Sequence, residues 1–118
     1  MAVVNQYRFY GKTTTAAETV TLLSPSVNET VIIKSLRVTN KSGSNTPTVT
    51  IKNNAFEIVN TQTLVAATSV EILSLPLIVE GGTTLAYTTA GTASDGVVFG
   101  ISYLNIFCLL YTSDAADE

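Results

Sequence analysis

The sequence predicts an all-β fold, a single antiparallel β-sandwich of about eight strands. Stretches in which apolar and polar residues alternate recur at roughly eight- to twelve-residue intervals, separated by clusters of Gly, Pro, Asn and Ser. No segment shows a helical repeat of useful length. Thr and Val are abundant and only 13% of the residues are charged, which is typical of an ordered β domain. A jelly-roll-like arrangement fits best, and an immunoglobulin-like sandwich is the alternative.

The longest predicted strand covers residues 31–40, which are rich in β-branched side chains. Its alternation breaks at Lys34 and Ser35, because the apolar residues before and after this pair have opposite parity. A one-residue β-bulge at Lys34–Ser35 would restore a single core face, and we therefore expect one there. The bulge would bring four side chains together on that face: Val31, Ile33, Leu36 and Val38.

A polar loop, residues 41–47, separates this strand from a second one at 48–52 that alternates without a break. The Gly, Ser, Asn and Pro in the loop indicate a chain reversal, so we expect the two strands to pair as a hairpin. A tight turn is expected next, at Asn53–Asn54.

The rest of the chain predicts further short strands at residues 3–10, 19–23, 55–59, 69–73, 75–79, 83–88 and 97–106. Phe56 and Ile58 are expected to face inward. Pro76 lacks an amide proton, so it should begin a strand or lie on a sheet edge. Four residues of the last strand share one face: Val97, Phe99, Ile101 and Tyr103.

Aromatic residues are concentrated in the first strand, at Tyr7, Phe9 and Tyr10. They cannot all face one core, so at least one of them, Tyr10 before the others, should be exposed or in contact with another chain. Arg37 falls at an outward position of the longest strand. The candidate residues for an interface or a ligand contact are Tyr7, Tyr10, Arg37 and Tyr87.

The C-terminal residues 108–118 resemble the translation of a transposase adaptor from sequencing libraries, and the match is unbroken from Cys108 to Glu118. We therefore expect one domain at residues 1–107 and a non-native tail at 108–118. The tail holds the single Cys and three of the nine acidic residues, so six acidic residues remain against six basic ones. The low isoelectric point then says little about partners.

The residue types of the predicted domain give no basis for catalysis. His is absent, and without Cys the Ser-His and Cys-His nucleophile systems and most zinc sites are excluded. The carboxylates fall in loops or at outward strand positions and form no evident catalytic pair. We expect no enzyme activity, no catalytic residue, no metal ligand and no cofactor.

Composition also narrows the classes of partner. The balanced charge argues against nucleic acid, and the remaining apolar run at the C-terminal end is too short to cross a membrane. Other proteins, and as an alternative glycans, are the partners that we expect.

Several stretches resemble small structural proteins of tailed bacteriophages, particularly marine ones. The residues that carry the resemblance are 5–11, 32–40, 75–85 and 101–104. The resemblance implies a β-sandwich virion protein, made in the host bacterial cytoplasm, that serves as a capsid decoration, neck or tail-associated subunit. Such a protein would act by self-assembly as a homo-oligomer and by contacts with other virion proteins. The alternative is a carbohydrate- or receptor-binding module of a phage fibre.

Overall fold

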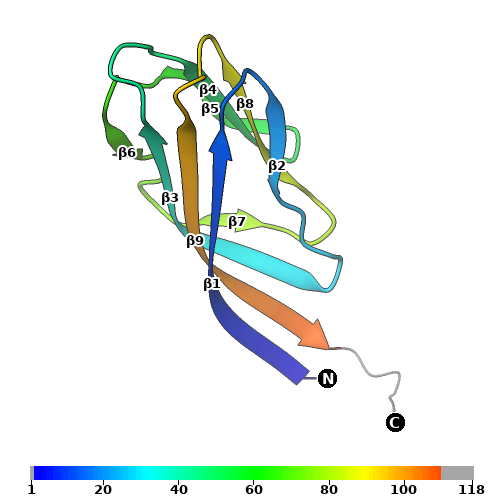
Figure 1. The fold of residues 1–118 in the computed structure, drawn as a ribbon. Coiled ribbons are helices and arrows are strands. Elements are labelled where there is room, and N and C mark those ends of the chain that lie inside the picture. The colour runs from blue at the N-terminus through cyan, green and yellow to red at the C-terminus, as the bar shows by residue number, and fades with distance from the viewer. Residues whose placement is uncertain (1, 110–118) are drawn as a thin grey trace.

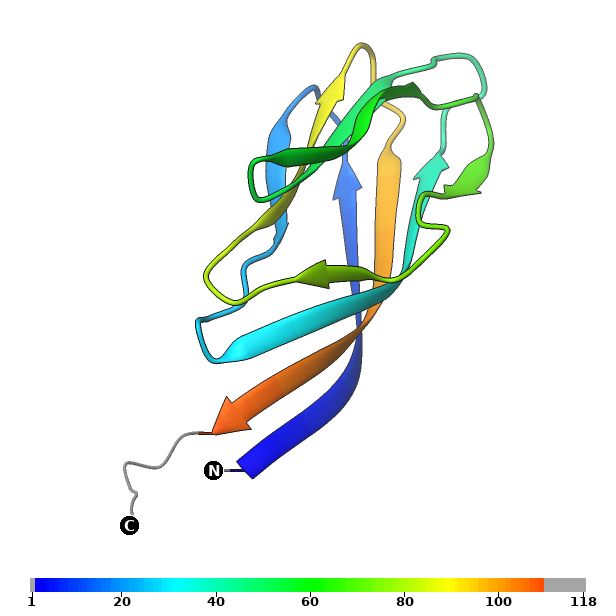
Figure 2. The ribbon, with the colours of Figure 1, turned by 180° about the vertical axis from the view of Figure 1, so that it is seen from behind.

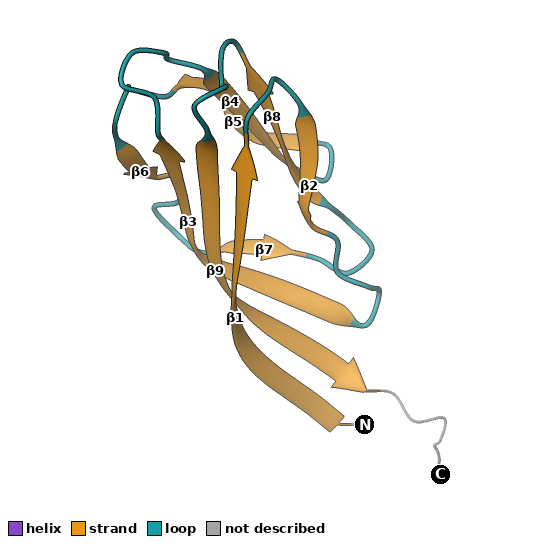
Figure 3. Cartoon of the chain, in the orientation of Figure 1, coloured by secondary structure: helices purple, strands orange, loops and turns teal. Residues whose placement is uncertain are grey.

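The computed structural model describes the backbone of residues 2–109, which form nine β-strands in two antiparallel sheets (Figures 1 and 3). One sheet has five strands: β1 (Ala2–Thr14), β3 (Glu29–Asn40), β6 (Ser69–Glu71), β7 (Leu77–Val79) and β9 (Val97–Leu109). Their order is β1-β9-β3-β6, and β7 also pairs with β3. The other sheet has four: β2 (Thr19–Leu23), β4 (Thr48–Asn53), β5 (Phe56–Thr63) and β8 (Leu85–Ala90). Their order is β2-β8-β4-β5.

The strand pairs are nested along the chain in the manner of a jelly roll. The first strand, β1, pairs with the last, β9, and β2 pairs with β8. Inside them β3 pairs with β6 and β7, and β4 pairs with β5 at the centre of the nest. One long folded ribbon of this kind wraps into two facing sheets. The predicted all-β sandwich is confirmed, and the strand order is that of the jelly roll rather than of the immunoglobulin-like alternative.

The predicted hairpin across residues 41–47 is wrong, because β3 and β4 lie in different sheets. Asn40, whose side chain is buried, explains the change of direction. Its side-chain nitrogen, Nδ2, donates to the carbonyl oxygens of Asn45 and Leu64 at 2.9 and 3.1 Å. Its side-chain oxygen, Oδ1, accepts from the backbone amide of Ser42 at 3.1 Å. These bonds hold the loop as an arch that carries the chain across to the other sheet.

The predicted tight turn is present but lies one residue later, at Asn54–Ala55, because Asn53 is the last residue of β4. Asn53 pairs with Phe56, and Asn54 has a positive φ of 58°, a conformation that Asn tolerates in short hairpin turns. The expected inward position of Phe56 is wrong, because its side chain is 71% exposed. Ile58 is half-buried and packs against the core, as expected.

Lys34 is the extra residue of a β-bulge in β3. Ile33 and Ser35 pair with adjacent residues of β9, so β3 uses two residues where β9 uses one. The bulge predicted from the sequence is confirmed, and the four apolar side chains that flank it are all buried. The bulge also divides β3 between two neighbours, since β7 pairs before it and β6 pairs after it.

The core lies between the sheets and is centred on an aromatic pair. Tyr87 of β8 stacks on Phe99 of β9, with ring centroids 3.7 Å apart and ring planes inclined by 16°. Apolar side chains of both sheets surround this pair, and most of them are fully buried. Among the buried residues of β9 are Val97, Phe99 and Ile101, and Tyr103 on the same face is half-buried, which confirms the predicted face of this strand. Pro76 directly precedes β7, as predicted.

The longest strands continue past the four-stranded sheet. In Figures 1 and 2 the N-terminal part of β1, the C-terminal part of β9 and the beginning of β3 form a bent, three-stranded extension below the rest of the sandwich. Cys108 and Leu109, the first residues of the expected non-native tail, continue β9 opposite β1. Residues 110–118 lie outside the described part of the chain.

Candidate interaction surface

A row of apolar side chains crosses the outer face of the five-stranded sheet. Tyr7 of β1 pairs with Leu104 of β9, Leu104 with Ile32 of β3, and Ile32 with Ile78 of β7. Their neighbours Val31 and Val79 point into the core, so this row points away from it. We call these four residues, Tyr7, Leu104, Ile32 and Ile78, the outer apolar row.

The two ends of the outer apolar row are strongly exposed. Tyr7 is 79% and Ile78 is 55% exposed, whereas Leu104 and Ile32 between them are half-buried. Phe9, also on the outer face, adds a second aromatic ring that is 71% exposed. A continuous apolar strip with aromatic rings at one end is a recognised property of protein contact surfaces.

Two facing glycines produce a hollow beside this row. Gly11 of β1 pairs with Gly100 of β9, so two neighbouring positions of the sheet carry no side chain. The ring of Phe9 lies over this gap, because a Cβ added at Gly100 would meet two Phe9 ring atoms at 3.3 Å. The hollow has a volume of about 270 Å³. Phe9, Val98 and Ser102 line one side of it, and Ser35, Arg37 and Thr39 line the other.

Arg37 is exposed at the edge of this hollow and pairs with Gly100 on one side and Glu71 on the other. The Glu71 carboxylate accepts hydrogen bonds from Ser35 Oγ at 2.5 Å and from the Leu36 amide at 2.7 Å. Burial by itself would raise the pKa of Glu71, but these hydrogen bonds outweigh it and the pKa is lowered. Glu71 therefore binds the backbone at the bulge of β3.

A second polar cluster lies on the inner side, where β3 and β9 leave the sandwich. The Glu29 carboxylate accepts from the Ser26 amide at 2.8 Å and from Asn105 Nδ2 at 3.1 Å. The bond from Ser26, followed by that from Asn105, lowers the pKa of Glu29. Asn105 Oδ1 is buried without a hydrogen-bond partner. Tyr103 and Asn105 line a small hollow of about 180 Å³ beside Glu29.

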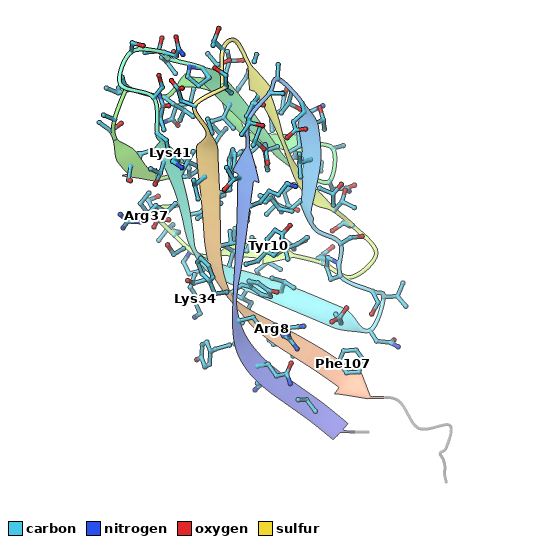
Figure 4. The ribbon with its side chains drawn as sticks, in the orientation of Figure 1. Arg8, Tyr10, Lys34, Arg37, Lys41 and Phe107 are labelled. Atoms are coloured by element: carbon cyan, nitrogen blue, oxygen red, sulfur yellow. The ribbon has the colours of Figure 1, made fainter. Side chains whose placement is uncertain are left out.

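The structure separates the four candidate contact residues. Tyr7 and Arg37 share the outer face of the five-stranded sheet. Tyr10 is on the opposite face, is only 36% exposed, and lies on the other side of β9 from Arg37 in Figure 4. The expectation that at least one of the three aromatic residues of β1 is exposed is confirmed, and Tyr7 and Phe9 are far more exposed than Tyr10.

Tyr87 is a core residue, and its assignment as a surface contact is wrong. Its side chain is only 1% exposed, and its hydroxyl hydrogen-bonds with Thr14 Oγ1 in the interior. Burial raises the pKa of Tyr87, and the bond to Thr14 offsets only part of that rise. The shared parity of Tyr87 with Leu85, an obvious core residue, is the sequence signal for this position.

Several residues of this surface could not be identified from the sequence. Leu104, Ile32 and Ile78 become neighbours only through the register of three strands, which local patterns do not specify. In the sequence, Glu71 looks like an ordinary surface charge at an outward strand position. The one sequence signal for its role is the break in alternation at Lys34, because a β-bulge leaves a nearby backbone amide without a partner on the neighbouring strand.

The described residues contain no group of three or more His, Cys, Asp and Glu side chains placed to hold a metal ion. Within the same residues no helix is long and apolar enough to cross a membrane.

Comparison with known proteins found two solved structures that are similar to this protein. No protein-family model matches the chain, and no curated protein sequence matches it. A chain in the structure of infectious bursal disease virus, Gx strain, is similar over 89% of this protein, with 15% identity and a TM-score of 0.44. A chain of the Gt strain of this virus gives 14% identity and a TM-score of 0.43 over the same share. The protein spans about a third, 32%, of each of these viral chains.

Proposed function

We propose that this protein is a virion structural protein of a tailed bacteriophage, located in the virion after synthesis in the host bacterial cytoplasm. It serves as a capsid decoration, neck or tail-associated subunit. It binds other virion proteins and copies of itself, and it acts without catalysis and without a cofactor. The observation that carries the proposal is the outer apolar row, which spans four strands of one sheet and has two strongly exposed ends.

The physical argument begins with the cost of leaving this row in water. Each buried Å² of apolar surface contributes roughly 25 cal/mol to association, so covering Tyr7, Phe9 and Ile78 is favourable. The half-buried Leu104 and Ile32 complete a surface with few charges, and the aromatic rings are typical anchors of protein interfaces. The charged Arg37 and Glu71 lie at the margin, as polar residues do at an interface rim.

Sedimentation velocity over a range of protein concentrations tests the assembly. The wild-type protein should form a defined oligomer, and the double variant Tyr7→Ser, Ile78→Ser should shift toward the monomer. The matched control is Thr21→Ser, Thr88→Ser, which changes two exposed positions on the outer face of the four-stranded sheet. A wild-type protein that stays monomeric at high concentration would count against self-assembly.

The genetic context tests the virion role separately. Sequencing the DNA on both sides of the coding sequence should find genes for portal, capsid or tail proteins. Flanking genes of ordinary cellular metabolism would contradict the assignment to a virion.

The hollow beside Phe9 supports a second candidate, a carbohydrate- or receptor-binding module of a phage fibre. It combines an exposed aromatic ring with an arginine and the hydroxyl groups of Ser35, Thr39 and Ser102, which together match the apolar faces and hydroxyls of a sugar. A glycan array tests it, with Phe9→Ala and Arg37→Ala as variants that should abolish any binding. Absence of binding by the wild-type protein would eliminate this candidate. Tyr7 and Tyr10 lie on opposite faces of the sheet and so do not belong to one binding surface.

A further inference from the structure

The free edges of the two sheets differ in how well they are protected against pairing with another strand. On the four-stranded sheet, the edge strand β2 has five residues and a register shift between Thr21 and Leu23. The other edge strand, β5, has two register shifts against β4 and a positive φ of 55° at Thr61. On the five-stranded sheet, β6 and β7 have three residues each. Short length and bulges are the usual devices that prevent edge-to-edge association.

The edge strand β1 has neither of these devices. It is 13 residues long and pairs with β9 at every position from Ala2 to Thr14 without a register shift. It contains no proline and no residue with positive φ. Side chains 4–10 are all exposed. Such a strand presents a long row of unpaired backbone groups on the side away from β9.

We propose that β1 pairs antiparallel with β1 of a second copy across a two-fold axis at Phe9, so that the two five-stranded sheets join into one continuous sheet. This inference rests on the proposed self-assembly and specifies the partner and the contact. Antiparallel pairing of a strand with itself is compatible with two-fold symmetry, in which each surface patch meets its own copy.

The charges of β1 select the register of this pairing. Arg8 and Lys12 are the charged residues of the strand. A two-fold axis at Arg8 would pair all thirteen residues but would place the two guanidinium groups opposite each other. An axis at Tyr10 would place Arg8 opposite the Lys12 of the second copy, which is also unfavourable.

An axis at Phe9 avoids both conflicts and keeps residues 4–14 paired, eleven of the thirteen. Phe9 then lies opposite its own copy, and Arg8 lies opposite the ring of Tyr10 from the second copy. Cross-strand aromatic pairs and cation–π contacts both stabilise a sheet of this kind. An axis at Tyr7 also keeps eleven residues paired, residues 2–12, but it places Phe9 opposite the polar Asn5.

The paired edge would also enlarge the proposed contact surface. Tyr7 and Phe9 of each copy point to the outer face, so four aromatic rings would gather along the seam between the two sheets. The outer apolar row of one molecule would then face the same way as that of its neighbour. A dimer built in this way presents one broad apolar surface to further virion proteins.

Disulfide trapping tests the register, in a Cys108→Ser background that removes the single Cys of the sequence. Phe9→Cys should form a covalent dimer on mild oxidation, because residues opposite each other in antiparallel strands have Cα atoms about 4.5–5.5 Å apart. Tyr7→Cys should not, since two copies would lie about 13 Å apart along the seam. Thr88→Cys, on the outer face of the other sheet, is the matched control.

A dimer trapped through Tyr7→Cys in place of Phe9→Cys, or through Thr88→Cys equally well, would overturn the proposal. A second measurement does not depend on variants. In hydrogen exchange, alternate amides of β1, those that point away from β9, should become protected as the wild-type protein concentration rises. Packing of the sheet faces would not produce this alternating pattern.

The outcome also separates this inference from the proposed function. A protein that associates in sedimentation but shows neither the Phe9→Cys dimer nor the alternating protection assembles by another surface, and only the edge pairing fails. A protein that remains monomeric in all three experiments contradicts both.

Discussion

The outer faces of the two sheets differ although their inner faces are alike. Both sheets bury Val, Ile, Leu and aromatic side chains against each other. On its outer face the five-stranded sheet presents Tyr7, Phe9 and Ile78. On its own outer face the four-stranded sheet presents a row of threonines: Thr19, Thr88, Thr50 and Thr61.

The threonine row is linked by its own hydroxyl groups. Thr19 Oγ1 and Thr88 Oγ1 are 2.9 Å apart, and the Thr61 amide donates to Thr50 Oγ1 at 3.0 Å. Thr is β-branched, so it favours the strand conformation as Ile does, but its hydroxyl is stable in contact with water. Secondary-structure preference therefore cannot explain the apolar residues of the other face. The proposed self-assembly would cover these exposed side chains.

The sheets also differ at their centres, since a central strand of the five-stranded sheet contains a bulge that a carboxylate stabilises. We predict that Glu71→Ala lowers the free energy of unfolding by about 1–3 kcal/mol, because the part-buried Leu36 amide loses its partner. Denaturant unfolding measures this change. Glu57→Ala is the control, because Glu57 is an exposed residue opposite Lys52 on the other sheet, and such pairs contribute about 0–1 kcal/mol. Equal losses for the two variants would show that Glu71 does not stabilise the bulge.

A charge placed on each outer face tests the comparison directly. We predict that Tyr7→Lys weakens self-association by about tenfold or more, equivalent to about 1.4 kcal/mol, because Tyr7 lies on β1 beside the proposed seam and a lysine must lose water to enter an apolar contact. Thr88→Lys should leave association unchanged. Analytical ultracentrifugation gives the self-association constants of both variants. A larger effect of Thr88→Lys would place the contact on the threonine face instead.

Alternation and turn chemistry allow the sequence to predict the sandwich, most strand positions and the Lys34 bulge. The bulge is predictable because one strand must keep a single core face, and the parity break at Lys34 leaves no other local solution. The turn that begins after Asn53 is equally local. Each of these features depends on residues within about ten positions of one another.

The incorrect predictions concern features that depend on contacts between distant parts of the chain. The loop at 41–47 has the length and composition of a hairpin loop, but it crosses to the other sheet and is held there by hydrogen bonds to distant residues, including the bond from Asn40 Nδ2 to the Leu64 carbonyl. Phe56 obeys the expected alternation poorly because β5 is irregular against β4. The outer apolar row requires the relative register of β1, β9, β3 and β7, which no short pattern specifies.

Acid should weaken the two carboxylate contacts of the five-stranded sheet. The folded-state pKa values of Glu71 and Glu29 are lowered from 4.5, so their stabilisation is present above about pH 4.5 and is lost as the pH falls through the folded values. We predict that the free energy of unfolding declines as the pH falls below about 4.5. Glu71→Gln should flatten this decline, and unfolding curves from pH 3 to pH 6 measure it. An unchanged slope in the variant would assign the acid sensitivity to Glu29 or to other carboxylates.

The smallest effect is expected on the threonine face. Thr88→Val keeps the β-branched shape and removes an exposed hydroxyl that bonds only to Thr19. We predict a change within about 0.5 kcal/mol in the free energy of unfolding and none in self-association, because water replaces the lost partner. The combined variant Thr19→Val, Thr88→Val goes one step further, since it creates an apolar strip of two residues on this face. If that strip alone produces oligomers, apolar character suffices for association in this fold. If it does not, the strand register and the aromatic end of the outer apolar row are what make the other face a specific contact surface.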